Sequence, residues 1–184
     1  MPESGAAGAG RGFTWDDLGD IAAGRPNLGQ TVPVAMYRLL QFTLRDAIAA
    51  AHGPEAARQA LVAAGRTAGR EFCRHALDRT LAPGPFLAAL QRTLREWGVG
   101  ILRVERSDLE RREFVLTVAE DLDCSGLPVS GDTVCEFDEG FIAGIFREYT
   151  GEEFTAREVD CWASGERVCR FEVSPAPGGG DGSV

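Results

Sequence analysis

Residues 135–173 read CEFDEGFIAGIFREYTGEEFTAREVDCWASGERVCRFEV, and this stretch carries the clearest structural pattern in the chain. Over residues 136–151, large apolar side chains recur about once per helical turn, which predicts a helix. The rest is rich in strand-forming residues around a Gly-containing turn, which predicts two strands, 152–161 and 166–173. A helix followed by a hairpin therefore closes the predicted domain.

The chain before this stretch shows helical patterns first and strand patterns later. Apolar stripes ended by glycine or proline predict three helices, at about 34–51, 55–77 and 83–98. Residues 99–106 and 113–120 are β-rich and separated by a charged turn, which indicates a hairpin. The order of three helices, two strands, a helix and two strands predicts an α+β fold, in which helices pack on an antiparallel sheet.

Composition limits the possible functions. The 184 residues carry a formal charge of −9, which argues against nucleic acid as the main partner. All 19 basic residues are arginine, so a Schiff-base lysine and a P-loop lysine are excluded. With 44% apolar residues, the chain can bury a core without disulfides.

The first residues lack the apolar segment of a signal peptide, and no apolar run approaches the roughly 20 residues of a membrane span. We therefore expect a cytoplasmic protein without a membrane span, in which thiols stay reduced. The ends are rich in Gly, Ala and Pro, so we expect disordered segments at 1–12 and 174–184 around one domain at 13–173.

Four of the five cysteines lie late in the chain, and Cys135, Cys161 and Cys169 fall at the ends of predicted elements. Ligands on a hairpin and at a helix start can converge on a tetrahedral metal ion. A fourth ligand could be Cys124 or Glu158, and spacing alone does not choose between them. Buried core cysteines are the alternative interpretation, because free cysteine often serves as a small apolar residue.

The stretch 135–173, with its GFIAGIF helix, its E-x-x-C and its C-x-A-x-G-x-x-x-C turn, resembles the 4-vinyl reductase domain, also described as a hydrocarbon-binding domain. The resemblance implies a fold related to the NO-signalling and Golgi-transport ligand-binding proteins, which include the sensory domains of phenol- and xylene-responsive activators and TRAPP tethering subunits. It also implies a closed zinc site formed by Cys135, Glu158, Cys161 and Cys169.

The resemblance further implies a pocket for an apolar ligand between the helices and the sheet. Large apolar side chains from both are the candidates for its wall: Phe72, Phe86, Leu90, Trp97, Phe114, Leu116, Phe141 and Ile145. Small residues at 64, 65, 68 and 69 would allow close helix contact, and from them we expect a homodimer through the first helices.

Three functions fit these observations. The first is a zinc-stabilised sensor or carrier that binds an aromatic, hydrocarbon or tetrapyrrole-like ligand, is not an enzyme, and signals through a downstream protein partner. The second is participation in vinyl reduction in chlorophyll biosynthesis, although the sequence has no nucleotide fingerprint to supply a hydride. The third is a dimeric protein-interaction module.

Overall fold

The computed structural model describes residues 11–177, and these form two units that divide between Thr31 and Val32. Within the first unit, the described residues contain the 3₁₀ helix η1 (Trp15–Leu18) and the short helix α1 (Ile21–Gly24). The division places residues 13–31 outside the compact unit that holds the sheet, whereas the sequence analysis assigned them to one domain with it. The expectation of disorder at residues 1–10 and 178–184 lies outside the described residues.

The second unit contains four helices among its described residues: α2 (Val34–His52), α3 (Pro54–Ala76), α4 (Pro83–Glu96) and α5 (Glu136–Thr150). Each lies within about two residues of its predicted position. Gly53 separates α2 from α3 with a φ of 92°, a conformation that favours glycine. Proline at the start of α3 and of α4 fits the first helical turn, where its missing N–H is not needed.

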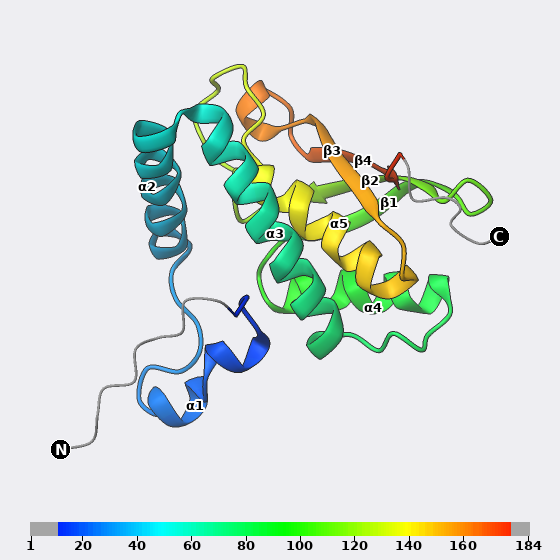
Figure 1. Cartoon of the computed structure of the whole chain (residues 1–184), viewed down its shortest axis with the longest axis horizontal. Helices are drawn as coiled ribbons and strands as arrows, with labels where there is room; N and C mark the ends of the chain where they lie inside the picture. The colour runs from blue at the N-terminus through cyan, green and yellow to red at the C-terminus, as the bar shows by residue number, and fades with distance from the viewer. Residues whose placement is uncertain (1–10, 178–184) are drawn as a thin grey trace. The chain divides into compact units, whose positions relative to one another are not determined.

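Four antiparallel strands form one sheet in the order β1-β2-β4-β3 (Figure 1). Their bounds are Ile101–Asp108 for β1, Glu113–Ala119 for β2, Phe154–Asp160 for β3 and Cys169–Pro175 for β4. The two predicted hairpins are therefore present, and β2 pairs with β4 to join them. β4 continues to Pro175, so the predicted tail boundary at residue 174 is wrong by two residues, because the pairing of Phe154 with Pro175 extends the ladder.

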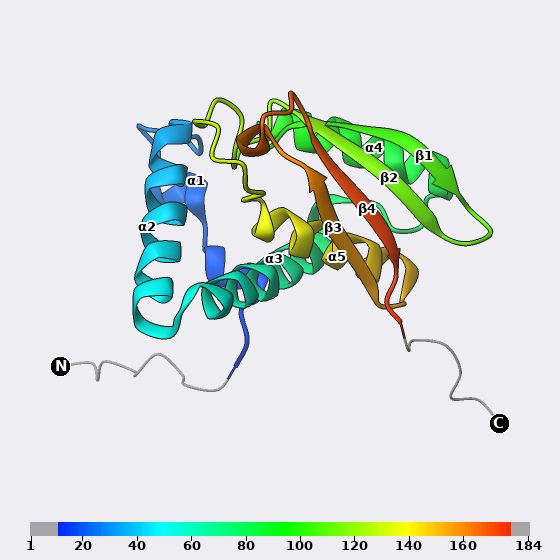
Figure 2. The same cartoon turned by 90° about the horizontal axis from the view of Figure 1, so that it is seen from above.

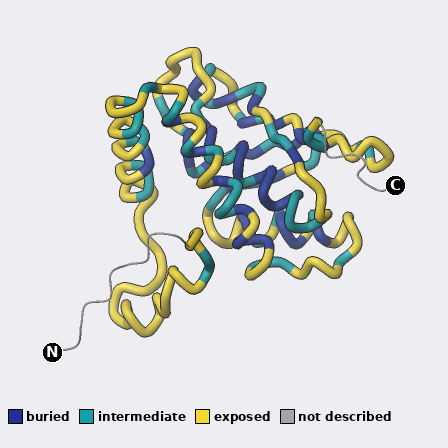
Figure 3. The backbone as a smooth tube through the Cα atoms, in the orientation of Figure 1, coloured by how far each residue is buried: buried dark blue, intermediate teal, exposed yellow. Residues whose placement is uncertain are grey.

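Helices α4 and α5 pack on the sheet, α3 packs on α5, and α2 packs on α3 (Figure 2). The sheet turns alternate side chains inward, as a half-buried sheet requires, and the inward residues of β2 are Phe114, Leu116 and Val118. Phe171 and Val173 of β4 continue the same buried surface. Burial is concentrated in α5 and the adjoining sheet, whereas α2 is mostly exposed (Figure 3). The predicted α+β architecture is confirmed.

Four glycines allow α3 and α5 to approach until their backbones touch. A Cβ on Gly65 or Gly69 would overlap the backbone oxygen of Phe137 or Phe141 in α5, and a Cβ on Gly140 or Gly144 would overlap carbonyl oxygens of α3. Gly65 and Gly69 were expected to serve a contact between two copies of the chain. Instead they pack inside one chain, because the partner that needs their space is α5.

No helix among residues 11–177 has both the length and the apolar character needed to cross a membrane.

Candidate metal centre and ligand hollows

Four cysteines from four places in the chain meet at one end of the sheet. Cys124 lies in the loop after β2, Cys135 immediately precedes α5, Cys161 follows β3, and Cys169 begins β4. All four side chains are at most 1% exposed. The short 3₁₀ helix η2 (Trp162–Ser164) and Gly165, with a φ of 108°, turn the chain back so that Cys161 and Cys169 face each other. We call this group the thiol cluster.

The spacing of the sulfurs suits a tetrahedral metal ion. The Sγ atom of Cys135 lies 3.8 Å from those of both Cys161 and Cys169, and Cys124 lies 3.0 Å from Cys169. All four sulfurs lie within 4.8 Å of one another, and none is in a disulfide. A tetrahedron with Zn–S bonds of about 2.3 Å has S–S edges of about 3.8 Å. The thiol cluster can therefore bind a metal ion.

Glu158, which the family resemblance implied as the fourth ligand, lies beside this group rather than within it. Its Oε2 accepts a hydrogen bond from the backbone N–H of Cys135 at 3.1 Å, and its own N–H donates to Glu139 at 2.9 Å. Its Oε1 is buried and has no hydrogen-bond partner among the described residues. The geometry thus places Cys124 in the group of four and gives Glu158 the position of a carboxylate that fixes the start of α5.

The thiols perturb one another's acidity because they are buried together. Contact with Cys124 lowers the pKa of Cys161, and contact with the same thiol raises the pKa values of Cys135 and Cys169. Burial raises the pKa of Glu158 to about 8. A first thiolate therefore forms at Cys161, and the remaining protons leave when a cation compensates the negative charge.

Two further carboxylates border the thiol cluster. Oxygens of Asp121 and Asp138 lie within 4.8 Å of each other and of the Cys135 sulfur. Burial raises the pKa of Asp121 to about 6 and raises that of Asp138 well above its usual value. Asp121 accepts hydrogen bonds from the backbone N–H groups of Asp123 and Cys124, whereas Oδ2 of Asp138 is buried without a hydrogen-bond partner in the described chain.

These two carboxylates also line a cavity of about 30 Å³ between α4, α5 and the sheet, which we call the inner cavity. Apart from Asp121 and Asp138, its wall is made of glycine and apolar side chains: Leu90, Leu94, Val99, Gly100, Leu102, Leu116, Val118, Phe141, Ile142, Ile145 and Phe146. The inner cavity therefore has one acidic end in an otherwise apolar wall.

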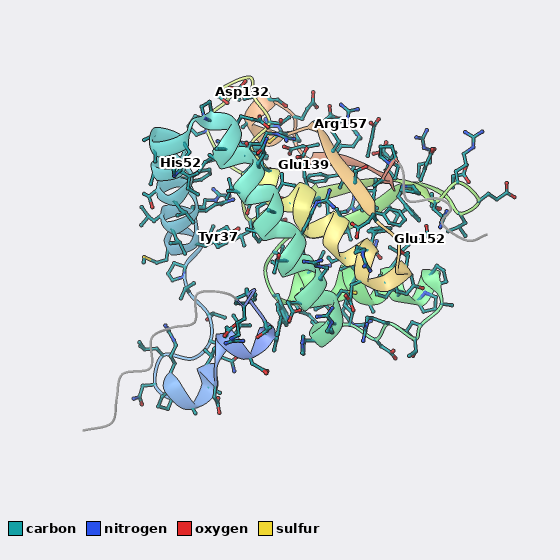
Figure 4. All side chains as sticks on the ribbon, in the orientation of Figure 1. Tyr37, His52, Asp132, Glu139, Glu152 and Arg157 are labelled. Carbon is teal, nitrogen blue, oxygen red and sulfur yellow. The ribbon has the colours of Figure 1, made fainter. Side chains whose placement is uncertain are left out.

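A larger hollow of about 260 Å³ lies nearby, and Phe146 is a wall of both spaces. We call it the outer hollow. Its lining is rich in aromatic rings: Pro83, Phe86, Leu87, Leu109, Arg112, Phe114, Phe146, Tyr149, Thr150 and Phe154. Its polar groups are already engaged, since Tyr149 donates its hydroxyl to the carbonyl of Leu81 at 2.8 Å and Arg112 pairs with Glu152, which Figure 4 labels.

The candidate pocket residues from the sequence divide between these spaces. Phe86 and Phe114 line the outer hollow, and four others line the inner cavity: Leu90, Leu116, Phe141 and Ile145. Phe72 and Trp97 line neither space. They form an edge-to-face pair at 5.2 Å, and Trp97 is 55% exposed because it lies where α4 ends.

The loop that carries Asp121 and Cys124 is bound to α2 by polar contacts. Asp123 accepts hydrogen bonds from the Tyr37 hydroxyl at 2.7 Å and from Gln41 at 2.6 Å, and Arg38 donates to carbonyl oxygens of the same loop. Figure 4 labels Tyr37 on α2. This loop therefore connects the thiol cluster, the inner cavity and α2.

The sequence analysis missed Asp121 and Asp138 as site residues. A signal existed for Asp138, because it precedes Phe141 and Ile145 by three and seven residues and so lies on the apolar stripe of α5. Asp121 had no such signal, since an acidic residue in a polar loop is normally solvated.

Solved structures share this fold. The phenol-responsive sensory domain of the transcription activator PoxR, with phenol, matches with a TM-score of 0.62 and 18% identity over 80% of this chain and 76% of that one. A vinyl-4-reductase family protein of Methanocaldococcus jannaschii gives 0.60 and 16% over 91% and 99%. A trafficking protein particle complex subunit 3 of Naegleria fowleri, covalently bound to palmitic acid, gives 0.59 and 10% over 78% and 95%. The fold is thus one shared by vinyl reductase-like domains and a trafficking-complex subunit.

Residues 114–175 match the family model of the 4-vinyl reductase domain, which confirms the resemblance seen in the sequence. This segment contains β2, the whole thiol cluster, α5 and the final hairpin. The uncharacterized protein MJ0150 of M. jannaschii is 26% identical over 160 residues, which are 85% of this chain and 86% of that protein. MJ1642 of the same organism is 34% identical over 58 residues, 32% of this chain and 36% of its own length.

Proposed function

We propose that this protein binds a small apolar molecule and acts as a sensor or carrier rather than as an enzyme. The observation that carries the proposal is the aromatic-lined outer hollow of about 260 Å³ between α4, α5 and the sheet. Concave, mostly apolar hollows are the usual ligand sites of proteins. Two similar folds support it, since one is described with phenol and the other with covalently bound palmitic acid.

The size of the outer hollow favours some ligands over others. A hollow of about 260 Å³ lies just below the roughly 300–1,000 Å³ of sites for drug-sized molecules. It therefore suits a single aromatic ring or a short hydrocarbon better than a tetrapyrrole. Stacked rings such as Phe86 and Tyr149, with centroids 3.7 Å apart, offer apolar faces to such a ligand.

We further propose that the thiol cluster holds zinc through Cys124, Cys135, Cys161 and Cys169. Thiolate ligands suit zinc, and four of them leave no position open for catalysis, so the ion would be structural. It would join the β2 loop, the start of α5 and the final hairpin. Because α5 also supplies Phe146 and Tyr149 to the outer hollow, zinc would help to fix one wall of the ligand site.

Filling the outer hollow should abolish ligand binding. In Leu87→Trp the indole ring would occupy space between α4 and the sheet, so we expect affinity for an alkylbenzene such as propylbenzene to fall by about tenfold or more. Isothermal titration calorimetry measures this directly. Mass spectrometry of ligand extracted from the unaltered protein would identify the natural occupant.

Leu28→Trp is the matched control, because Leu28 is 77% exposed and does not line the outer hollow. Equal affinity in Leu87→Trp and in the parent would contradict the proposed site. Turnover that depends on NADPH would instead favour vinyl reduction.

A homodimer is the proposed assembly, now through α2. This helix exposes Met36, Leu40 and Leu44, spaced by four residues, with 56%, 67% and 49% of their surface accessible. Apolar residues at this spacing on an exposed helix face are typical of a contact surface. We expect sedimentation at micromolar concentration to give twice the chain mass of 19.7 kDa.

The double variant Leu40→Glu/Leu44→Glu should shift the dimer to a monomer, because it places charges in the contact. Leu109→Glu changes an equally exposed leucine outside α2 and should leave the assembly unchanged. A monomeric parent protein would reject the dimer.

A further inference from the structure

The acidic end of the inner cavity has no counterpart in the outer hollow. Asp121 is 4% exposed, and Asp138 points a buried, unpartnered Oδ2 into a region otherwise lined by apolar side chains. Neither carboxylate belongs to an ion pair within the described residues. A buried polar oxygen that lacks a partner costs roughly 1–3 kcal/mol, and more when it is charged, so the arrangement favours a ligand that supplies one.

The position of the inner cavity relates it to the outer hollow. Phe146 is a wall of both spaces, and it extends from α5 toward the sheet, where it lies 4.9 Å from the ring of Phe114 and 5.4 Å from that of Phe154. The inner cavity, at about 30 Å³, has room for about two water-sized groups. It cannot hold an aromatic ring, but it can hold a head group of one or two heavy atoms.

We propose that the inner cavity is the polar subsite of the ligand site, where Asp121 and Asp138 accept hydrogen bonds from a donor head group. The ligand is then an apolar molecule that ends in an ammonium or hydroxyl group, with its body in the outer hollow and its head beyond Phe146. This inference rests on the proposed ligand-binding function and specifies its chemical class. Molecules that end in a carboxylate or phosphate are excluded, because their oxygens would face two acceptors.

The electrostatics of the surroundings point the same way. The arginines near the thiol cluster are committed elsewhere: Arg45 pairs with Glu136, Arg58 pairs with Glu139 at 2.9 Å, and Arg38 donates to backbone carbonyls. The acidic pair therefore faces the inner cavity without a cation of its own among the described residues. A donor head group would supply the missing hydrogen bonds, and an ammonium group would also supply the missing charge.

A matched series of probes tests the inference on the unaltered, zinc-loaded protein. The series is 3-phenylpropylamine, 3-phenylpropanol, propylbenzene and 3-phenylpropanoate, which share one ring and one linker and differ only at the head. Titration calorimetry should show the amine and the alcohol binding at least about tenfold more tightly than propylbenzene, with the carboxylate weakest. If propylbenzene binds as tightly as both donors, or if the carboxylate binds most tightly, the polar subsite is refuted.

This design separates the two proposals. If none of the four probes binds, ligand binding in the outer hollow fails, and the polar subsite fails with it. If propylbenzene binds without any preference for a donor head, only the polar subsite fails.

A variant locates the effect on Asp138. Asp138→Asn keeps the size of the side chain but replaces one acceptor oxygen by a donor and removes the charge. The preference of the amine over propylbenzene should fall by about tenfold, while propylbenzene affinity and zinc content stay as in the parent. Asp132→Asn is the control, since Asp132 is an exposed acid in the loop before α5 that makes the same charge change (Figure 4). An unchanged preference in Asp138→Asn would overturn the assignment, and the probe series on the parent protein decides the question even if this variant does not fold.

Discussion

Removal of zinc by a chelator is expected to lower the melting temperature by about 10 °C. A ligand present at 1,000 times its dissociation constant stabilises the folded state by about 4 kcal/mol, and each kcal/mol is worth roughly 2–4 °C in a chain of this length. The effect should be large because the thiol cluster joins the β2 loop, α5 and both strands of the final hairpin. Metal analysis should find about one zinc per chain, and differential scanning calorimetry with and without chelator measures the shift. A metal-free preparation with an unchanged melting temperature would refute the zinc site.

Two single variants decide which residue is the fourth ligand. Cys124→Ser is expected to release zinc, because it removes a sulfur that lies 3.0 Å from Cys169. Glu158→Gln is expected to retain zinc, because its amide oxygen can still accept the hydrogen bond from the N–H of Cys135. The opposite pattern would restore Glu158 as the ligand that the family resemblance implied. Cys73→Ser is the control, since Cys73 is buried in α3 and does not belong to the thiol cluster.

Gly140→Ala is expected to destabilise the protein by about 3 kcal/mol or more, which corresponds to a loss of about 10 °C in melting temperature. In most helices the same change is stabilising by roughly 0.5–1 kcal/mol, because alanine has the higher helix propensity. The sign reverses here because the new methyl group would overlap the backbone oxygen of Val62 in α3. A rigid carbonyl cannot move aside as a flexible side chain can, so the two helices must separate.

Gly84→Ala provides the matched control for this prediction. Gly84 also lies in a helix, α4, but a Cβ there would meet no other atom within 4 Å. We expect its melting temperature to stay the same or to rise slightly. Thermal unfolding followed by circular dichroism compares the two variants, and equal stabilities would show that the contact between α3 and α5 tolerates a methyl group.

The helices and strands of the second unit followed from local pattern. In α5 the apolar residues recur at helical spacing, and in the strands Phe114, Leu116 and Val118 alternate with less buried neighbours. These periods reflect which side of each element meets the core, so they are readable without a structure. The three thiols at Cys135, Cys161 and Cys169 were also predictable, since each lies at the end of an element whose position was known.

Pattern could not decide which groups from distant segments meet. Cys124 and Glu158 were equal candidates by sequence, and only the path of the loop after β2 brings the sulfur of Cys124 to that of Cys169. Likewise, Gly65 and Gly69 indicated a close helix contact without naming the partner, which proved to be α5 of the same chain.

By itself, the sequence determined an α+β fold of the 4-vinyl reductase type, the order of its helices and strands, and a group of thiols able to bind a metal ion. Tertiary structure alone decided the fourth member of that group, the partner of the glycines, and the meeting of Asp121 with Asp138 beside an apolar cavity. The reason is physical: periodicity records the side of an element that faces the core, whereas the neighbour on that side depends on how the loops close and how the elements pack.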